Sequence, residues 1–131
     1  MRDVPIGARG TYTFTVDKEH LASRGVPTLP DVLATGQMIG AMEIAAIDAV
    51  KPFLDADETS VGISVNVKHL APTPLGNVVR AEAEVIATEG RRLEFKVRAA
   101  DEHEEIGAGT HGRAVIKPDK FKDRIEAKAK K

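Results

Sequence analysis

The sequence contains no cysteine, which excludes disulfide bonds and a thiol nucleophile. Basic and acidic residues nearly balance, at 19 and 20, so a nucleic-acid partner is not expected. Long apolar runs are also missing, because Glu43 and Asp48 interrupt the most apolar stretch and residues 1–10 hold no apolar signal-peptide core. We therefore expect neither a membrane span nor a signal peptide, and a cytoplasmic location.

The 131 residues, 42% hydrophobic and 30% charged, suit one compact domain with a single core. The last fifteen residues differ from the rest, with seven basic and three acidic side chains. We assign residues 1–117 to the domain and 118–131 to a basic tail, which is either a partly ordered helix or a frayed end.

A helix is predicted from about Asp31 or Thr35 to about Leu54, and its stretch 35–50 has the pattern of a core helix that carries an acid among its apolar residues. At about 100° per residue, Gln37 and Asp48 lie on the solvated stripe, whereas Glu43 lies roughly 120° away from it. No side chain three or four residues from Glu43 can pair with it. Desolvation raises the pKa of a carboxyl group, as a catalytic base requires. The alternative is a structural ion pair with a Lys or Arg on another element.

Two further polar residues point toward the same apolar side. Thr35 starts the helix and either faces the cavity of Glu43 or caps the helix. In the strand predicted over residues 60–70, His69 has the parity of the valines and is expected to face the core. The alternative for His69 is a core histidine with satisfied hydrogen bonds or a strand-end residue. The residues predicted to share its face are Val61, Ile63, Val65 and Val67.

Alternation of apolar and polar residues predicts five strands. They cover residues 10–16, 60–70, 79–87, 93–99 and 106–116, with a hairpin turn at 88–91. The pattern is one strand, one long helix and four antiparallel strands in a meander, which gives a two-layer α+β domain. Gly36 and Gly40 are costly in a helix, so we expect another element to pack against the backbone there. Open sheet edges are commonly covered by a second copy, and we expect a homodimer.

Four stretches resemble the fluoroacetyl-CoA thioesterase-like family of hotdog-fold acyl-CoA thioesterases. They are TG-x-M-x-G-x-x-E at 35–43, V-G-x-x-V-x-V-x-HLAPTP-x-G at 61–76, GRRLEFKV at 90–97 and GTHGRAVI at 109–116. The resemblance implies a single hotdog domain, with a long central helix wrapped by a curled antiparallel sheet of about five strands, in a dimer. It also implies hydrolysis of a short-chain acyl-CoA to the free acid and CoA, without metal or cofactor.

The resemblance further implies that Thr35, Glu43 and His69 are the catalytic set. Glu43 would act as base for water or as a nucleophile, His69 would shuttle a proton, and Thr35 would stabilise the oxyanion. Gly62 would donate its backbone N–H to the thioester carbonyl, within one chain or across the dimer interface, and Arg113 would position a site residue or the substrate.

The same resemblance places an aromatic lid over the acyl pocket, within residues 26–33. This segment reads VPTLPDVL and contains no aromatic residue. We expect Leu29, Val32 and Leu33 to line the pocket and the substrate to be a short acyl-CoA; the missing aromatic residue leaves selectivity for a fluorinated acyl group open.

The nucleotide of CoA needs a basic surface. Arg91, Arg92, Arg113 or the lysine-rich tail could supply it, although each is equally consistent with an ordinary solvated surface.

Two other functions use the same fold. A non-catalytic acyl-CoA-binding or ligand-sensing protein would not need Glu43 as a base. A hydratase usually carries an Asp and a His five positions apart, and no such pair occurs in the sequence.

Overall fold

The computed structural model describes residues 1–130. It contains one five-stranded sheet, one long helix and a C-terminal helix. The elements in chain order are β1 (Arg9–Thr15), the 3-10 turn η1 (Lys18–His20), α1 (Ala22–Gly25), α2 (Thr35–Val50), the 3-10 turn η2 (Lys51–Phe53), β2 (Thr59–His69), β3 (Val78–Glu89), β4 (Arg92–Ala100), β5 (Glu105–Ile116) and α3 (Pro118–Ala129).

The strands form an antiparallel sheet in the order β1-β3-β4-β5-β2. The predicted meander is therefore correct for β3, β4 and β5 but wrong for β2, which pairs with β5. The reason is the connection after β2: its Thr73 carbonyl accepts from the Leu33 N–H, and the Gly76 N–H donates to Val16. This segment crosses the end of the sheet to the β1 side instead of making a hairpin. Strands β1 and β2 are left as the two edges.

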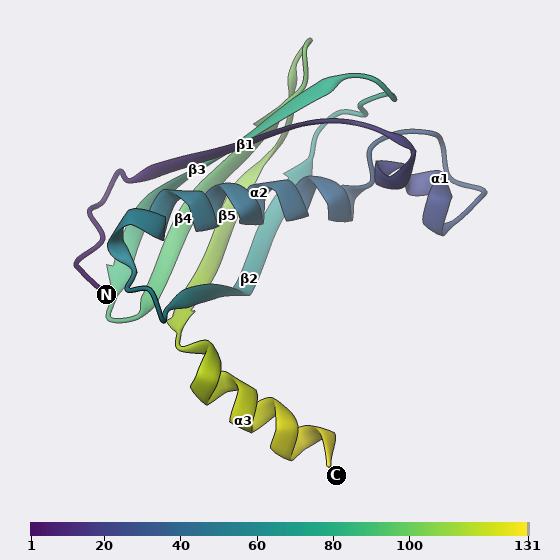
Figure 1. Ribbon diagram of the computed structural model, residues 1–131. Helices are drawn as coiled ribbons and strands as arrows, with labels where there is room; N and C mark the ends of the chain where they lie inside the picture. The colour runs from purple at the N-terminus through teal and green to yellow at the C-terminus, as the bar shows by residue number, and fades with distance from the viewer. Residues whose placement is uncertain (131) are drawn as a thin grey trace.

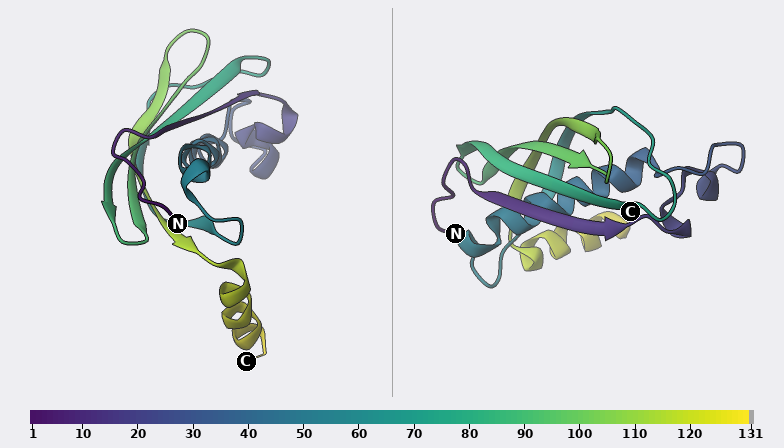
Figure 2. Two further views of the ribbon diagram at one scale, coloured as in Figure 1. Left: turned by 60° about the vertical axis from the view of Figure 1, so that its left-hand side comes forward. Right: turned by 90° about the horizontal axis from the view of Figure 1, so that it is seen from above.

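The sheet curls around α2, which lies in its concave face (Figure 1). Seen nearly end-on, α2 sits inside the cup of the strands (Figure 2). This is the arrangement of long helix and curled sheet that the resemblance predicts. Small side chains dominate the buried face of the helix, which consists of Met38, Ala41, Met42, Ala45, Ala46, Ala49 and Val50.

Close packing against the helix backbone comes from β1. A Cβ atom at Gly10 would overlap the backbone of Ala45 and Ala49, so β1 lies directly on α2. The same test finds no atom within 4 Å of a Cβ at Gly36 or Gly40 in the described chain. The prediction of close packing at these two helix glycines is therefore wrong for the single chain.

Strand β2 contains a bulge that changes its phase. The pairing with β5 shifts between Gly62 and Ser64, so Ile63 has no partner on β5. A Cβ at Gly62 would point at Glu43 on the helix side, and His69 also reaches back to α2. Two residues seven positions apart thus share a face. The predicted common face of Val61, Ile63 and His69 is wrong, because an extra residue inverts the alternation.

Helix α3 forms most of the predicted basic tail and projects away from the sheet (Figure 1). Residue 131 lies outside the described chain. None of the α3 residues is buried. No helix among residues 1–130 is long and apolar enough to cross a membrane.

Candidate active site

Arg113, on β5, is the buried cation of the site. Its side chain is only 4% exposed, and strand alternation directs it toward α2. Nε donates to Ser60 Oγ at 2.8 Å and Nη2 donates to the Ser60 carbonyl at 2.7 Å. Burial lowers the pKa of the guanidinium, while the neighbouring carboxylate of Glu43 raises it. Because the ordinary pKa of arginine lies above 12, the group keeps its charge.

His111 supports Arg113 from two residues earlier on the same strand face. Its Nδ1 lies 2.7 Å from the Ser64 carbonyl, and its Nε2 lies 3.1 Å from Arg113 Nη1. A carbonyl only accepts and a guanidinium only donates. The proton therefore belongs on Nδ1, and Nε2 accepts from Arg113. The ring is 1% exposed and stacks on Phe95 at 6.2 Å between centroids.

Glu43 receives the remaining contact of Arg113. Its Oε2 lies 3.3 Å from Arg113 Nη1, and its side chain is 39% exposed. The structural alternative considered for Glu43 is thus realised, since an arginine on another element pairs with it. The ion pair fixes Oε2 of the carboxylate, and the partial exposure of the side chain leaves the carboxylate accessible to solvent. An ideal Cβ on Gly62 would lie 3.0 Å from the same Oε2, so the absence of a side chain there leaves room beside the carboxylate.

Thr35 and His69 form a second pair. Thr35 Oγ1 lies 2.8 Å from His69 Nδ1. The helix-cap alternative for Thr35 is wrong, because the N-cap is Ala34 and no side chain caps α2. His69 Nε2 is buried and has no hydrogen-bond partner among the described residues. Buried polar atoms normally find a partner, so this nitrogen is not that of a satisfied core histidine.

The two groups lie apart in one chain. Thr35 and Glu43 are separated by eight residues of α2, or about 12 Å along its axis. Gly62 and His69 are separated by roughly 23 Å along β2. No hydrogen bond or ion pair within residues 1–130 joins Glu43 to Thr35 or to His69. The structure therefore brings together Thr35 with His69, and separately Glu43 with Gly62 and Arg113.

The predicted acyl-pocket residues lie before α2. Leu29 is 45% exposed, whereas Leu33 is 1% exposed and belongs to the core. Val32 forms an isolated bridge to Pro74. The three side chains do not share one environment, and their role in substrate binding stays a prediction.

One cluster has the composition of a metal site. Asp17, Glu19 and His20 each offer a ligand atom within 4.8 Å of the others. Their contacts explain them without a metal: Asp17 Oδ1 accepts from the Glu19 N–H, and His20 Nδ1 accepts from the Asp17 N–H. Asp17 and His20 of the cluster form the capping box of η1.

Sequence reasoning missed Ser60 and His111. Strand parity could have indicated His111, because it lies two residues from Arg113 on the same strand. Ser60 could not be found in this way, because its position opposite Val115 depends on the pairing of β2 with β5, which the sequence did not predict.

Comparison with known proteins then decides the family. A family model described as fluoroacetyl-CoA-specific thioesterase (FlK) matches residues 16–119. The chain belongs to this family. A fluoroacetyl-CoA thioesterase from Streptantibioticus cattleyicolor is 40% identical over 129 residues, covering 94% of this chain and 93% of that enzyme. The family prediction made from the four motifs is confirmed.

Solved FlK thioesterase structures have the same fold. One, solved to explain activity and substrate specificity, aligns with a TM-score of 0.91 and 39% identity, over 96% of this chain and 98% of that chain. A variant of FlK in complex with fluoroacetate and CoA aligns with a TM-score of 0.83 and 41% identity, over 89% and 98%. The predicted α+β fold is confirmed.

Proposed function

We propose that this chain is an acyl-CoA thioesterase that hydrolyses a short-chain acyl-CoA to the free acid and CoA. One observation carries the proposal. In a chain of the FlK family, the carboxylate of Glu43 is held by the buried Arg113, beside the bare backbone of Gly62. A fixed, reachable carboxylate next to a potential N–H donor is what activation of water on a thioester requires.

In the proposed reaction, Glu43 takes a proton from water while the water oxygen bonds to the thioester carbonyl carbon. The carbonyl oxygen becomes an oxyanion and accepts hydrogen bonds from the Gly62 N–H and the Thr35 hydroxyl. The carbon–sulfur bond then breaks, and CoA leaves as a thiolate that receives its proton through His69. Alternatively, Glu43 attacks the carbonyl itself, and water hydrolyses the resulting anhydride.

This scheme needs groups that one chain keeps apart, and a second copy supplies them. Strand β2 is a sheet edge, and it exposes Ile63 at 50% and Val65 at 45%. Such an edge is a template for pairing with another strand. We propose a homodimer in which the two β2 strands pair antiparallel around a two-fold axis.

The two-fold axis would assemble the site. Because Ile63 is an inserted residue, Gly62 and His69 each lie three pairing positions from Asn66. Around an axis at Asn66, His69 lies near the partner subunit's Gly62, because symmetry opposes residues at equal distances. The bulge at Ile63 turns both residues toward the helix side. The Thr35–His69 pair then faces the carboxylate of the partner subunit's Glu43, and two sites form per dimer.

The first experiment measures thiol release from a panel of acyl-CoAs, namely acetyl, propionyl, butyryl, haloacetyl and phenylacetyl. We expect turnover of a short-chain member and a loss of about 100-fold or more in kcat for Glu43→Ala and for His69→Ala. Binding of acyl-CoA without thiol release from any panel member would instead support the ligand-sensing function.

Mixing the two inactive variants tests the shared site. A heterodimer of Glu43→Ala and His69→Ala contains one site with both residues intact if the site spans the interface. After subunit exchange, about a quarter of the wild-type activity should return, since half of the dimers are mixed and half of their sites are intact. If each site lies within one chain, every site in the mixture keeps a defect and no activity returns.

The acyl group is proposed to be small but not fluorine-specific. The relative from Streptantibioticus cattleyicolor is described as acting on fluoroacetyl-CoA. Residues 26–33 of this chain contain no aromatic side chain. The exposed apolar residue nearest the middle of this segment is Leu29. We expect acetyl-CoA and fluoroacetyl-CoA to be hydrolysed with kcat/KM values within about 200-fold of each other, because one apolar contact discriminates by only about 1–3 kcal/mol, or roughly 10-fold to 200-fold. The absence of cysteine is consistent with action in the cytoplasm.

A further inference from the structure

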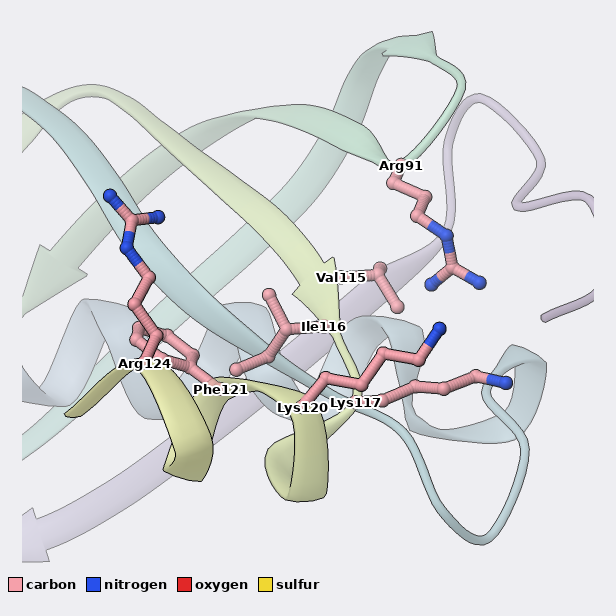
Figure 3. A pocket seen from close by; sticks show the side chains of 7 residues that line it. All are labelled: Arg91, Val115, Ile116, Lys117, Lys120, Phe121 and Arg124. Carbon is pink, nitrogen blue, oxygen red and sulfur yellow. The ribbon is translucent and has the colours of Figure 1, made fainter. Parts of the chain in front are cut away.

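A hollow of about 430 Å³ lies between the end of β5 and helix α3. Figure 3 shows its side chains: Arg91 enters from the β3–β4 hairpin, and the others come from the end of β5 and from α3. Its walls combine three apolar residues with four cations. They are Val115, Ile116 and Phe121, and Arg91, Lys117, Lys120 and Arg124.

The cations of this hollow exceed the acids that pair with them. Arg91 bonds to Glu58 at 2.9 Å, and Lys117 lies 3.7 Å from Asp57. Lys120 and Arg124 have no carboxylate within 4 Å among residues 1–130. Lys120 and Arg124 therefore contribute two positive charges without a carboxylate partner to this hollow, on a chain whose net charge is −1. Arginine and lysine side chains bind phosphate groups through charge-assisted hydrogen bonds.

The apolar wall adds a second requirement for the ligand. Phe121 is half-buried and lies beside Ile116 (Figure 3), so a flat ring could rest on an aromatic face next to the cations. Bases stack on aromatic side chains, while basic residues bind the phosphates next to them. The combination fits a phosphorylated nucleoside better than inorganic phosphate alone.

The position connects this hollow to the proposed active site. Val115 follows Arg113 by two residues on β5, or about 7 Å. Arg113 holds Glu43. A substrate with its thioester at Glu43 and its other end directed along β5 toward α3 would meet the side chains of Lys120 and Arg124 in this hollow.

We propose that the hollow between β5 and α3 binds the 3′-phosphate, diphosphate and adenine of the CoA substrate. The inference rests on the proposed thioesterase function. It assigns the nucleotide contacts to Lys120, Arg124 and Phe121, and it places Arg91 on the wall of the hollow formed by the β3–β4 hairpin. It excludes two of the basic residues considered from the sequence: Arg113 is buried on Glu43, and Arg92 lines a different hollow.

The test uses the double variant Lys120→Gln/Arg124→Gln, because glutamine keeps the helix propensity of α3. The matched control is Lys122→Gln, on the same helix but outside the hollow and paired with Glu126. Calorimetric titration with 3′,5′-ADP should show binding weakened by about tenfold or more in the double variant and unchanged in the control. Phe121→Ala should weaken 3′,5′-ADP but leave pyrophosphate binding unchanged.

Kinetics give an independent readout. In the double variant, KM for acyl-CoA should rise by about tenfold at unchanged kcat, while hydrolysis of the acyl-pantetheine, which lacks the nucleotide, should stay at the wild-type rate. Unchanged 3′,5′-ADP affinity in the double variant would overturn the proposal, even if the protein is an active thioesterase.

If no acyl-CoA is hydrolysed but 3′,5′-ADP binding depends on Lys120 and Arg124, the site stands and the proposed function fails. Light scattering completes the test. A change from dimer to monomer in the double variant, with 3′,5′-ADP binding retained, would mean that this hollow is an interface between copies and would overturn the proposal.

Discussion

Adding one methyl group at Gly62 should damage catalysis while sparing the fold. In Gly62→Ala, the new Cβ would lie 3.0 Å from Glu43 Oε2, 3.3 Å from His111 Cε1 and 3.5 Å from Arg113 Nη1. The first distance is a few tenths of an ångström too short. Glu43 is flexible and 39% exposed, so its carboxylate is the group that moves.

The size of the effect follows from the pair that the methyl group disturbs. The Glu43 to Arg113 distance is already 3.3 Å, so a small shift takes it beyond hydrogen-bond range. A misplacement of about 1 Å costs roughly 100-fold in rate. We expect kcat to fall by about 10-fold to 100-fold, and the midpoint of thermal unfolding to change little, since Gly→Ala also reduces the entropy of the unfolded chain.

The assay is thiol release under saturating acyl-CoA, with thermal unfolding measured on the same samples. The control is Gly25→Ala, because a Cβ at Gly25 meets nothing within 4 Å. A Gly62→Ala enzyme with wild-type kcat would show that the position of the Glu43 carboxylate does not matter, and would remove it from the mechanism.

Two further predictions concern the supporting residues. His111→Phe keeps the ring stacked on Phe95 but removes the Nδ1 contact of the Ser64 carbonyl and leaves Arg113 Nη1 with Glu43 alone. The free energy of unfolding should fall by about 1–3 kcal/mol, with a lower kcat, as measured by urea denaturation and thiol release. A stable, fully active variant would contradict the support role. For Asp101, burial raises the pKa, but hydrogen bonds from the N–H groups of His103 and Glu104 and from the Thr73 hydroxyl hold it below its usual range. Its stabilisation is therefore present above the unfolded pKa of about 3.9 and lost as the pH falls below it, so urea denaturation from pH 6 to 2 should show a steeper loss for the wild type than for Asp101→Asn. Parallel curves would refute this assignment.

The helix and most strands could be predicted because their patterns are local. The acid of Glu43 stands out from the apolar stripe of α2, and the hairpin at residues 88–91 matches the turn between β3 and β4. The place of β2 could not be predicted in the same way, since strand order depends on the path of residues 70–77 and not on their composition.

Which residues of β2 face the helix could not be predicted fully either, for another reason. Residues 61–69 alternate without a break, so nothing marks Ile63 as an inserted residue. The bulge is imposed by the partner strand β5, where Arg113 and Gly112 face Gly62 and Ser64. The face of His69 was nonetheless predicted correctly, because the phase error falls on the residues before the bulge.

The contact between Gly10 and α2 has a consequence for where the carboxylate of Glu43 can be. At Gly10, β1 contacts the helix backbone itself beside Ala45 and Ala49, so no long side chain separates the two elements at this point. A slip of one residue would carry Glu43 about 1.5 Å along the axis and 100° around it, away from Arg113. The position of the Glu43 carboxylate thus depends on the packing of β1 against α2. A mutation at Gly10, outside the proposed active site, would therefore lower the reaction rate by shifting the helix.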